Sequence, residues 1–210
     1  LGKQREFEQF NFCLGTEGIK RDNEEKYSLY IINNFFGGSV SSILFQKIRE
    51  ERGLAYSVYS TPVSFKNAGI FTIYAALSNK EILNVARLIK EEIIKFKKNL
   101  IGKSDLLKLK EQLKSSYILE MESTFDRMLE IGSSELLTGD ALTLEEVLNK
   151  INKVSLDDIK RVTEKIFDSS KFNIAYVGNI SNIEDTNAKL KEIFFSWGDK
   201  YYEDKSCKQK

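Results

Sequence analysis

Two apolar runs joined by a short turn set the strongest limit on how this chain can fold. Residues 55–65 and 69–77 are rich in the β-branched and aromatic side chains that favour strands, and only residues 66–68 separate them. A connection this short is typical of a hairpin, in which the strands pair antiparallel. Because Pro62 has no N–H to donate, we expect an edge position, a bulge or an interruption in the first run. The hairpin argues against a fully parallel sheet.

The remainder of the chain is predicted to contain two further strands and a series of helices. The strands are expected at residues 7–14 and 172–177, where apolar residues alternate or run together. Apolar positions at helical spacing, with polar residues before them and glycines after them, predict the helices. Their expected ranges are 22–36, about 39–52, 78–96, 104–137 in pieces, a helix after Thr143, a helix after Ser155, and about 182–195.

Four of these helices begin with residue pairs typical of a capping box. In this motif a Ser, Thr or Asp side chain and an acidic side chain three residues later satisfy backbone N–H groups at the helix start. The pairs are Asp22 with Glu25, Ser78 with Glu81, Thr143 with Glu146, and Ser155 with Asp158.

The order of these elements predicts the fold class. One strand, two helices, the hairpin, several helices and a last strand do not alternate as the parallel units of an α/β protein would. No linker rich in proline or glycine divides the 210 residues. We therefore expect a single α+β domain over residues 1–210, with an antiparallel or mixed sheet and helices packed on one face.

Composition argues against several classes of function. The 210 residues include no histidine, so the chain alone lacks the imidazole that most zinc hydrolases and Ser–His or Cys–His nucleophile pairs require. The 32 Lys and Arg residues against 31 Asp and Glu residues leave a net charge of +1, which provides no strong basic field for nucleic acid. No apolar stretch approaches the roughly 20 residues of a membrane span, so none is expected.

Some features of the sequence have simple structural interpretations. Gly37 and Gly38 could form an anion cradle at a helix start, but the lysine of a P-loop and the third glycine of a dinucleotide fingerprint are missing. A plain helix break is the preferred interpretation there. Adjacent carboxylates such as Glu50 and Glu51 fit a solvated helix face.

Residues 33–60 contain the candidate site. A helix ends with Arg49, breaks at Gly53 and gives way to a strand that begins near Tyr56. A guanidinium and a phenol delivered from two rigid elements to one corner could hold a peptide carbonyl or an oxyanion. Spacing alone leaves a structural alternative open, in which Arg49 only supports the helix end and Tyr56 is an amphipathic side chain at a strand edge.

The same stretch, NNFFGGSVSSILFQKIREERGLAYSVYS, resembles the second-half signature of the pitrilysin/insulinase family of zinc peptidases, the clan of mitochondrial processing peptidase. It has the family's Gly-Gly turn, its paired serines followed by Leu-Phe, and the Arg-Glu-x-x-Gly-Leu-x-Tyr pattern that contains Arg49 and Tyr56. Ile43 departs from the arginine that often follows the paired serines, so no role is carried over to that position. The order of elements is also similar to that of one family half over nearly the whole chain.

The resemblance implies a mitochondrial-processing-peptidase-like fold and a site divided between two halves. In that family the first, homologous half holds zinc on an inverted His-x-x-Glu-His helix with a further Glu. The second half supplies an Arg and a Tyr that reach the substrate across an enclosed chamber. Carried over, Arg49 and Tyr56 are the expected substrate-binding residues, and neither a metal ligand nor a catalytic residue is expected in this chain.

The resemblance also implies partners for the chain. They are a zinc-bearing half, in the same parent chain or as a separate subunit, and an unfolded or extended peptide. An exposed sheet edge could accept that peptide as an added strand. Because the chain begins at Leu1 without an initiator Met or a signal-like segment, we expect a processed product or a fragment of a longer protein. The high content of Lys, Ile and Asn indicates an AT-rich microbial genome, and with no signal-like segment we expect the bacterial cytoplasm as the location.

Two alternatives come from other functional classes. The same clan includes core subunits of a respiratory complex, so one alternative is a non-catalytic scaffold or assembly subunit of the same fold. A zinc motif elsewhere in the parent chain or in a neighbouring subunit would favour the peptidase. The other alternative, a nucleic-acid-binding module, is disfavoured by the net charge of +1.

Overall fold

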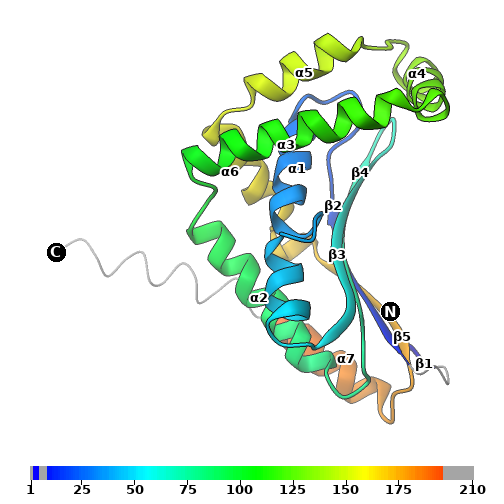
Figure 1. The fold of residues 1–210 in the computed structure, drawn as a ribbon. Coiled ribbons are helices and arrows are strands. Elements are labelled where there is room, and N and C mark those ends of the chain that lie inside the picture. The colour runs from blue at the N-terminus through cyan, green and yellow to red at the C-terminus, as the bar shows by residue number, and fades with distance from the viewer. Residues whose placement is uncertain (1, 5–8, 196–210) are drawn as a thin grey trace.

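The computed structural model describes residues 2–4 and 9–195 of the chain. Within them, five strands form one sheet in the order β1-β5-β2-β4-β3. β1 pairs with β5 in parallel, and the other neighbouring pairs are antiparallel. Figure 1 shows the helices gathered on one side of this sheet, which confirms the predicted α+β class. The strands are β1 (Gly2–Gln4), β2 (Phe10–Glu17), β3 (Ala55–Ser64), β4 (Gly69–Leu77) and β5 (Asn173–Gly178).

Seven α-helices and two shorter helical segments account for the other regular structure of the described residues. Segment η1 is π-helical, and η2 is a 3₁₀ turn. The helix predicted over residues 104–137 is confirmed in two pieces, which separate at Ser123. The elements are α1 (Glu25–Phe36), η1 (Phe45–Glu50), α2 (Ile82–Lys98), α3 (Lys103–Glu122), α4 (Thr124–Thr138), α5 (Leu144–Lys153), α6 (Leu156–Ile166), η2 (Ser169–Lys171) and α7 (Ile183–Phe195).

The predicted hairpin is confirmed. β4 has the predicted bounds, and β3 ends one residue early at Ser64. β3 lies at the edge of the sheet, as Pro62 indicates. The first predicted strand is observed as β2, shifted toward Glu17, and residues 7 and 8 of that prediction lie outside the described part. The sequence does not predict β1, because three residues are too few to show an alternating pattern.

The covered face of the sheet follows from alternation along β2. Phe10, Phe12 and Leu14 are buried, whereas Asn11 and Cys13 between them are only partly buried. Successive side chains of a strand point to opposite faces, so one face of the sheet meets the helices and the other does not.

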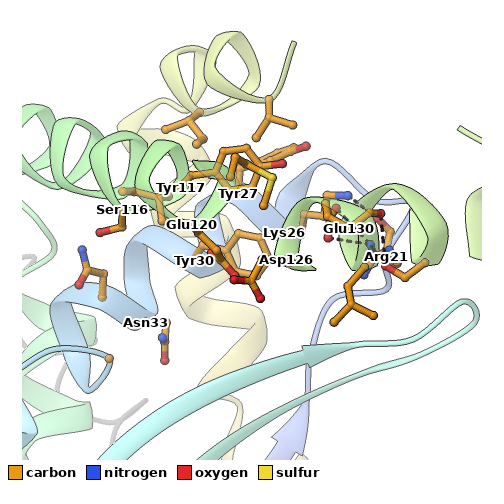
Figure 2. A pocket seen from close by; sticks show the side chains of 18 residues that line it. Arg21, Lys26, Tyr27, Tyr30, Asn33, Ser116, Tyr117, Glu120, Asp126 and Glu130 are labelled. Carbon is orange, nitrogen blue, oxygen red and sulfur yellow. Dashed lines mark hydrogen bonds and ion pairs between the residues drawn. The ribbon is translucent and has the colours of Figure 1, made fainter. Parts of the chain in front are cut away.

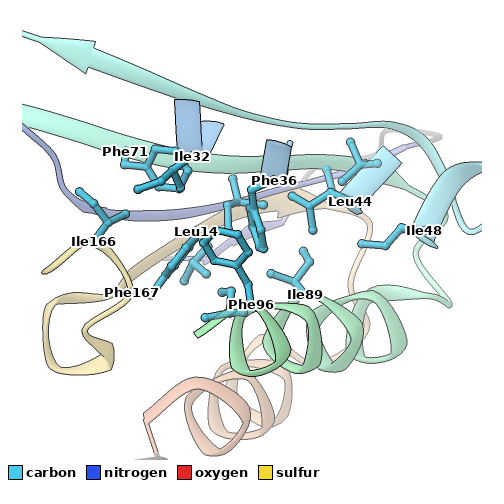
Figure 3. Packing of buried hydrophobic residues seen from close by; sticks show 14 of the residues in the cluster. Leu14, Ile32, Phe36, Leu44, Ile48, Phe71, Ile89, Phe96, Ile166 and Phe167 are labelled. Atoms are coloured by element: carbon cyan, nitrogen blue, oxygen red, sulfur yellow. The ribbon is translucent and has the colours of Figure 1, made fainter. Parts of the chain in front are cut away.

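The core lies between this covered face and the helices. Figure 3 shows Phe36 of α1, Phe96 of α2 and Phe167 after α6 close to Leu14 and Phe71 of the sheet. The ring centroids of Phe36 and Phe167 are 5.0 Å apart, and those of Phe36 and Phe96 are 5.6 Å apart. The stripe predicted for α2 is confirmed, because each of its members is buried: Ile82, Ala86, Ile89, Ile93 and Phe96.

Two of the four predicted capping boxes form. Thr143 with Glu146 begins α5, and Ser155 with Asp158 begins α6. In both, the hydroxyl accepts from the backbone N–H three residues later and the carboxylate accepts from the backbone N–H of the cap residue.

The other two predicted caps are wrong. At α1 the N–H of Glu25 donates to Asn23 Oδ1 at 2.8 Å, so Asn23 replaces Asp22, whose carboxylate pairs with Lys20 at 3.1 Å. The side chain one residue closer to the helix is better placed for its first N–H groups. Helix α2 begins only after Glu81 and has no side-chain cap. The N–H of Glu81 donates to the carbonyl of Ser78 at 3.0 Å, which forms a turn in place of a capping box.

Candidate functional site

The turn after α1 begins the segment that contains the predicted substrate-binding residues. α1 ends at Phe36, and helix resumes at residue 43 rather than at the predicted 39 or 41. The N–H groups of Gly37 and Gly38 both donate to the carbonyl of Asn33, at 2.9 and 2.7 Å. These amides are therefore committed to ending α1, which supports a helix break over an anion cradle.

Gly37 also allows α1 to approach the edge strand β3. A Cβ on Gly37 would lie 2.5 Å from Ser60 Oγ and 2.7 Å from Ser60 N, closer than real contacts. The N–H of Ser60 donates to the carbonyl of Gly37 at 2.9 Å, and the Ser60 hydroxyl donates to Asn33 Oδ1 at 2.7 Å. The first part of the signature thus fixes the end of α1 against β3.

Segment η1 ends in a tight reversal at Gly53. This glycine has φ +63°, in the left-handed region that a residue without Cβ adopts readily. The N–H of Gly53 donates to the carbonyl of Arg49, and that of Leu54 to the carbonyl of Ile48, both at 3.0 Å. Each bond is one residue wider than in the usual glycine-closed helix end, because it follows a π-helical segment. The helical segment ends before Gly53, so the predicted stop is confirmed. The reversal places Arg49 and Tyr56 on consecutive elements.

Arg49 is exposed on η1 and has free hydrogen-bond donors. Its guanidinium carbon lies 4.9 Å from the centroid of the Phe45 ring. Within the described residues its side chain makes no ion pair or hydrogen bond. Arg52 instead supports the end of η1, because it donates to the carbonyl of Lys47 at 2.8 Å. Arg49 also lies in the last turn of η1, so the structural alternative that spacing allowed for it stays open.

Tyr56 occupies a bulge at the start of β3. Leu77 and Ala76 are consecutive on β4, yet they pair with Ala55 and Ser57, so Tyr56 is the extra residue of β3. Bulges of this kind redirect a side chain and are frequent beside functional sites. The Tyr56 side chain is 61% exposed. Regular alternation in the sequence does not predict this bulge.

The outer edge of β3 is only partly open to an added strand. The N–H of Ser60 points away from β4 and toward Gly37. Every second residue of a strand directs its backbone polar groups to the same side, so those of residues 58, 62 and 64 also point to the outer edge. The N–H of Ser60 is already bonded, and Pro62 has none to offer. The expectation that a peptide could pair along this edge therefore narrows to the part of β3 that precedes Ser60.

A cavity of about 530 Å³ lies between α1, α3, α4 and α5, and sequence reasoning does not predict it. Figure 2 shows its mixed aromatic and charged lining. Neither Arg49 nor Tyr56 belongs to that lining. The lining includes Arg21, Lys26, Tyr27, Tyr30, Asn33, Tyr117, Glu120, Asp126 and Glu130.

Arg21 connects α4 to the segment before α1 at one end of this cavity. Its Nη2 donates to Glu130 Oε1 at 3.1 Å, to Ser134 Oγ at 2.9 Å and to Ser133 Oγ at 3.1 Å. More than one hundred residues separate these partners in the sequence. No local pattern could therefore have indicated the contact.

Burial shifts the pKa values of four groups in the cavity lining. It raises the pKa values of Tyr27, Tyr30 and Tyr117, so these phenols stay neutral. Burial, with a smaller contribution from the charge of Arg21, lowers the pKa of Lys26. The Lys26 ammonium donates to the carbonyl of Arg21 at 2.7 Å.

The described residues do not form a site that fits a zinc ion. The chain has no histidine, and among residues 2–4 and 9–195 no three His, Cys, Asp or Glu residues gather in a way that could hold a metal ion. Cys13 is partly buried, and burial raises the pKa of its thiol. No helix in the described part is long and apolar enough to cross a membrane.

Comparison with known proteins identifies related sequences. Residues 3–113 match the family described as the peptidase M16 inactive domain. The chain is 38% identical to the uncharacterized zinc protease YmxG of Bacillus subtilis, over 80% of this chain and 41% of that protein. It is 33% identical to an uncharacterized zinc protease of Streptomyces coelicolor, over 77% of this chain and 35% of that protein. The chain therefore spans about two fifths or less of the length of these curated relatives.

Solved structures share the fold. The crystal structure of the peptidase M16 inactive domain from Pseudomonas fluorescens has a TM-score of 0.75 and 22% identity, and the match covers 85% of this chain and 43% of that chain. A chain of Complex III2 from Candida albicans has a TM-score of 0.78 and 19% identity, with 92% and 48% covered. At these identities the likeness concerns the fold alone.

Proposed function

Because this chain belongs to the peptidase M16 inactive-domain family, we propose that it is the substrate-holding, non-metal half of a zinc peptidase. Its relatives in Bacillus subtilis and Streptomyces coelicolor are named zinc proteases, and each is more than twice as long as the matched region. In this proposal residues 1–210 act as one domain and close a chamber around an extended peptide. A homologous half, outside this chain, holds the zinc. Since these relatives are bacterial, we also propose the bacterial cytoplasm as the location.

The presentation of Arg49 and Tyr56 is the observation that carries this proposal. The Arg49 guanidinium has unengaged donors and rests over the Phe45 ring, which restricts where it can point. The bulge at Tyr56 presents a phenol that can donate one hydrogen bond. Each contact to a peptide carbonyl would stabilise the bound substrate by about 1–3 kcal/mol if it is desolvated.

The role of these two residues is binding and alignment. Two donors fixed on rigid elements hold a carbonyl in one orientation and so lower the entropic cost of reaching the reactive geometry. The backbone of β3 before Ser60 can add hydrogen bonds to the same peptide. Nothing in this set activates a nucleophile, so the 210-residue chain alone is proposed to lack peptidase activity, with or without added zinc.

A non-catalytic scaffold of the same fold is the second candidate. The TM-score of 0.78 with a chain of Complex III2 favours this candidate, because it means that this fold occurs in a large assembly. The sequence relatives, at 38% and 33% identity, are named zinc proteases and favour the peptidase. A zinc-binding motif in the rest of the parent protein is required by the first candidate and not by the second.

The experiment uses the complete parent protein and a fluorogenic extended peptide. In R49A and in Y56F we expect kcat/KM to fall by about 10- to 100-fold, which corresponds to about 1.4–2.7 kcal/mol. Zinc content, measured by atomic emission, should remain at the wild-type value, because neither residue is proposed to touch the metal.

Matched variants control for side effects of these substitutions. R87A removes an exposed arginine from α2, and Y59F removes a partly exposed phenol three residues along β3. Both should retain wild-type turnover. Wild-type kcat/KM in R49A and in Y56F would refute the assigned roles, and a parent protein that neither binds zinc nor cleaves peptides would favour the scaffold.

A further inference from the structure

Helix α4 presents most of its apolar side chains to solvent. Phe125, Met128, Leu129 and Ile131 are each at least half exposed, and Leu136 is 84% exposed. The buried residue of α4 is Ser134, which is polar. Single exposed apolar residues are normal on a protein surface, but a contiguous group indicates a surface that another part of a protein covers.

The exposed apolar residues continue onto the neighbouring helices. Leu119 of α3 is 65% exposed, and Leu144 at the start of α5 is 41% exposed. A groove of about 410 Å³ lies beside α3 and α4 and is lined partly by Ile118, Ile131 and Leu142. We call the exposed apolar side chains of residues 118–144 the α3–α4 apolar surface. Figure 1 shows α4 at one extremity of the molecule, far from α7.

Polar contacts attach α4 to the rest of the described structure. Glu130, Ser133 and Ser134 receive the guanidinium of Arg21. The polar side of α4 is therefore directed at the segment before α1. Leu129 and Ile131 line the cavity and the groove beside α3, whereas Phe125, Met128 and Leu136 line neither and are exposed. This orientation is the reverse of what an amphipathic helix adopts on its own core.

We propose that the α3–α4 apolar surface docks against the zinc-bearing half of the parent protein. The related proteins from Bacillus subtilis and Streptomyces coelicolor match this chain over only 41% and 35% of their lengths. More than half of such a protein thus lies outside this chain, which is enough to supply a complementary apolar face. The identity of this occupant rests on the proposed function. The surface is separate from Arg49 and Tyr56, which lie on η1 and β3.

The test measures the accessibility of single positions in the complete parent protein. L136C and F125C place a thiol at highly exposed positions of α4. Maleimide labelling is followed by mass spectrometry of the peptide that contains each thiol, so other cysteines do not interfere. The labelling rate in denaturant gives the intrinsic rate of each thiol, and the same variants in the 210-residue chain give the rate of the uncovered surface.

We expect labelling in the folded parent protein to be on the order of 10-fold or more slower than in the 210-residue chain, at every protein concentration. Equal rates in the two proteins would overturn the proposal. Protection that disappears when the parent protein is diluted would also overturn it, because the surface would then be covered by a second copy.

Labelling tests the docking surface and peptide turnover tests the substrate contacts, so either proposal can be refuted without the other. Protection of L136C together with unchanged turnover in R49A and Y56F would keep the docking surface and refute the proposed substrate contacts. Rapid labelling together with reduced turnover in those two variants would do the opposite.

Discussion

The body of the molecule and helix α4 (Thr124–Thr138), called the arm below, place apolar residues in opposite ways. In the body, α2 and α6 direct their apolar stripes into the core, and Ile89 and Ile159 are completely buried. In the arm, α4 has a comparable share of apolar residues, yet it exposes Phe125 and Leu136 and buries Ser134. A periodic pattern identifies which side of a helix is apolar, but it does not identify what covers that side.

The two regions also differ in what holds them. Around Phe167 the body is held by close ring contacts with Phe36, Phe71 and Phe96, at centroid distances of 5.0 to 6.0 Å. The arm is attached to the segment before α1 through the hydrogen bonds of Arg21 to α4, whereas the neighbouring helix α3 buries Leu106 and Leu109 in the core. The body is thus stabilised mainly by the hydrophobic effect, whereas the attachment of the arm depends on an ion pair that solvent can reach.

Removing a large side chain from each region should give the greatest contrast. F167A should lower the free energy of unfolding of the 210-residue chain by about 3–5 kcal/mol, because it leaves a cavity among three rings. F125A, at a position that is 62% exposed, should change it by less than about 0.5 kcal/mol. Urea denaturation followed by circular dichroism measures both. Similar losses in the two variants would contradict the distinction between body and arm.

Adding a methyl group should have opposite signs in the two regions. G37A introduces a Cβ 2.5 Å from Ser60 Oγ and 2.7 Å from its backbone N, and should cost about 1–3 kcal/mol as β3 moves away from α1. G132A lies within α4 and meets nothing within 4 Å, so it should stabilise the chain by about 0.5–1 kcal/mol through its higher helix propensity. The same denaturation experiment tests both, and a stabilising G37A would contradict the close approach.

The fold class could be predicted from the sequence because its determinants are local. The hairpin of β3 and β4, the stripe of α2 and the boxes at Thr143 and Ser155 each depend on residues within one continuous segment of the sequence. The predicted cap at Asp22 is wrong because Asn23 competes for the same N–H groups. A sequence pattern alone does not show which of two neighbouring polar residues will bond to the first N–H groups of a helix.

The candidate site could be predicted only in part. The helix stop at Gly53 and the positions of Arg49 and Tyr56 near it follow from a contiguous stretch of sequence. The bulge at Tyr56 depends on pairing with β4, and the contact of Arg21 with Glu130 spans most of the chain. Such features depend on strand register and on contacts between distant segments, and a local sequence pattern determines neither.

Breaking the attachment of α4 should loosen the arm more than the body. R21A leaves the Glu130 carboxylate without its partner and should cost about 1–2 kcal/mol. Hydrogen exchange should become faster in α4 and stay nearly unchanged in α2, because the core of the body is not touched. K189A, which removes an exposed pair with Asp185, serves as the control and should change stability by less than about 0.5 kcal/mol. Equal acceleration in α2 and α4 would show that the arm is not a separate unit.

The smallest expected effect compares equivalent first-turn aspartates of α6 and α4. Hydrogen bonds from the Ser155 hydroxyl and N–H lower the pKa of Asp158, whereas in α4 the Ser123 hydroxyl accepts from the N–H of Asp126 without a capping box. A depressed folded pKa means that the unfolded chain protonates first as pH falls. The stabilisation by Asp158 should therefore be complete above its ordinary pKa of about 3.9 and be lost as pH falls below it.

Substituting these aspartates tests that contribution, together with the pair that Asp158 forms with Arg161 at 2.7 Å. D158N should lower the free energy of unfolding by about 0.5 kcal/mol at pH 7, and the difference from wild type should shrink below pH 4. D126N should show a smaller loss at pH 7, because no return hydrogen bond of the box is removed. Urea midpoints measured from pH 3 to pH 7 give both curves. Coinciding curves would mean that the Ser155 box contributes no more than the general attraction of a carboxylate to a helix N-terminus. The helices of the body and of the arm would then not differ in how they begin.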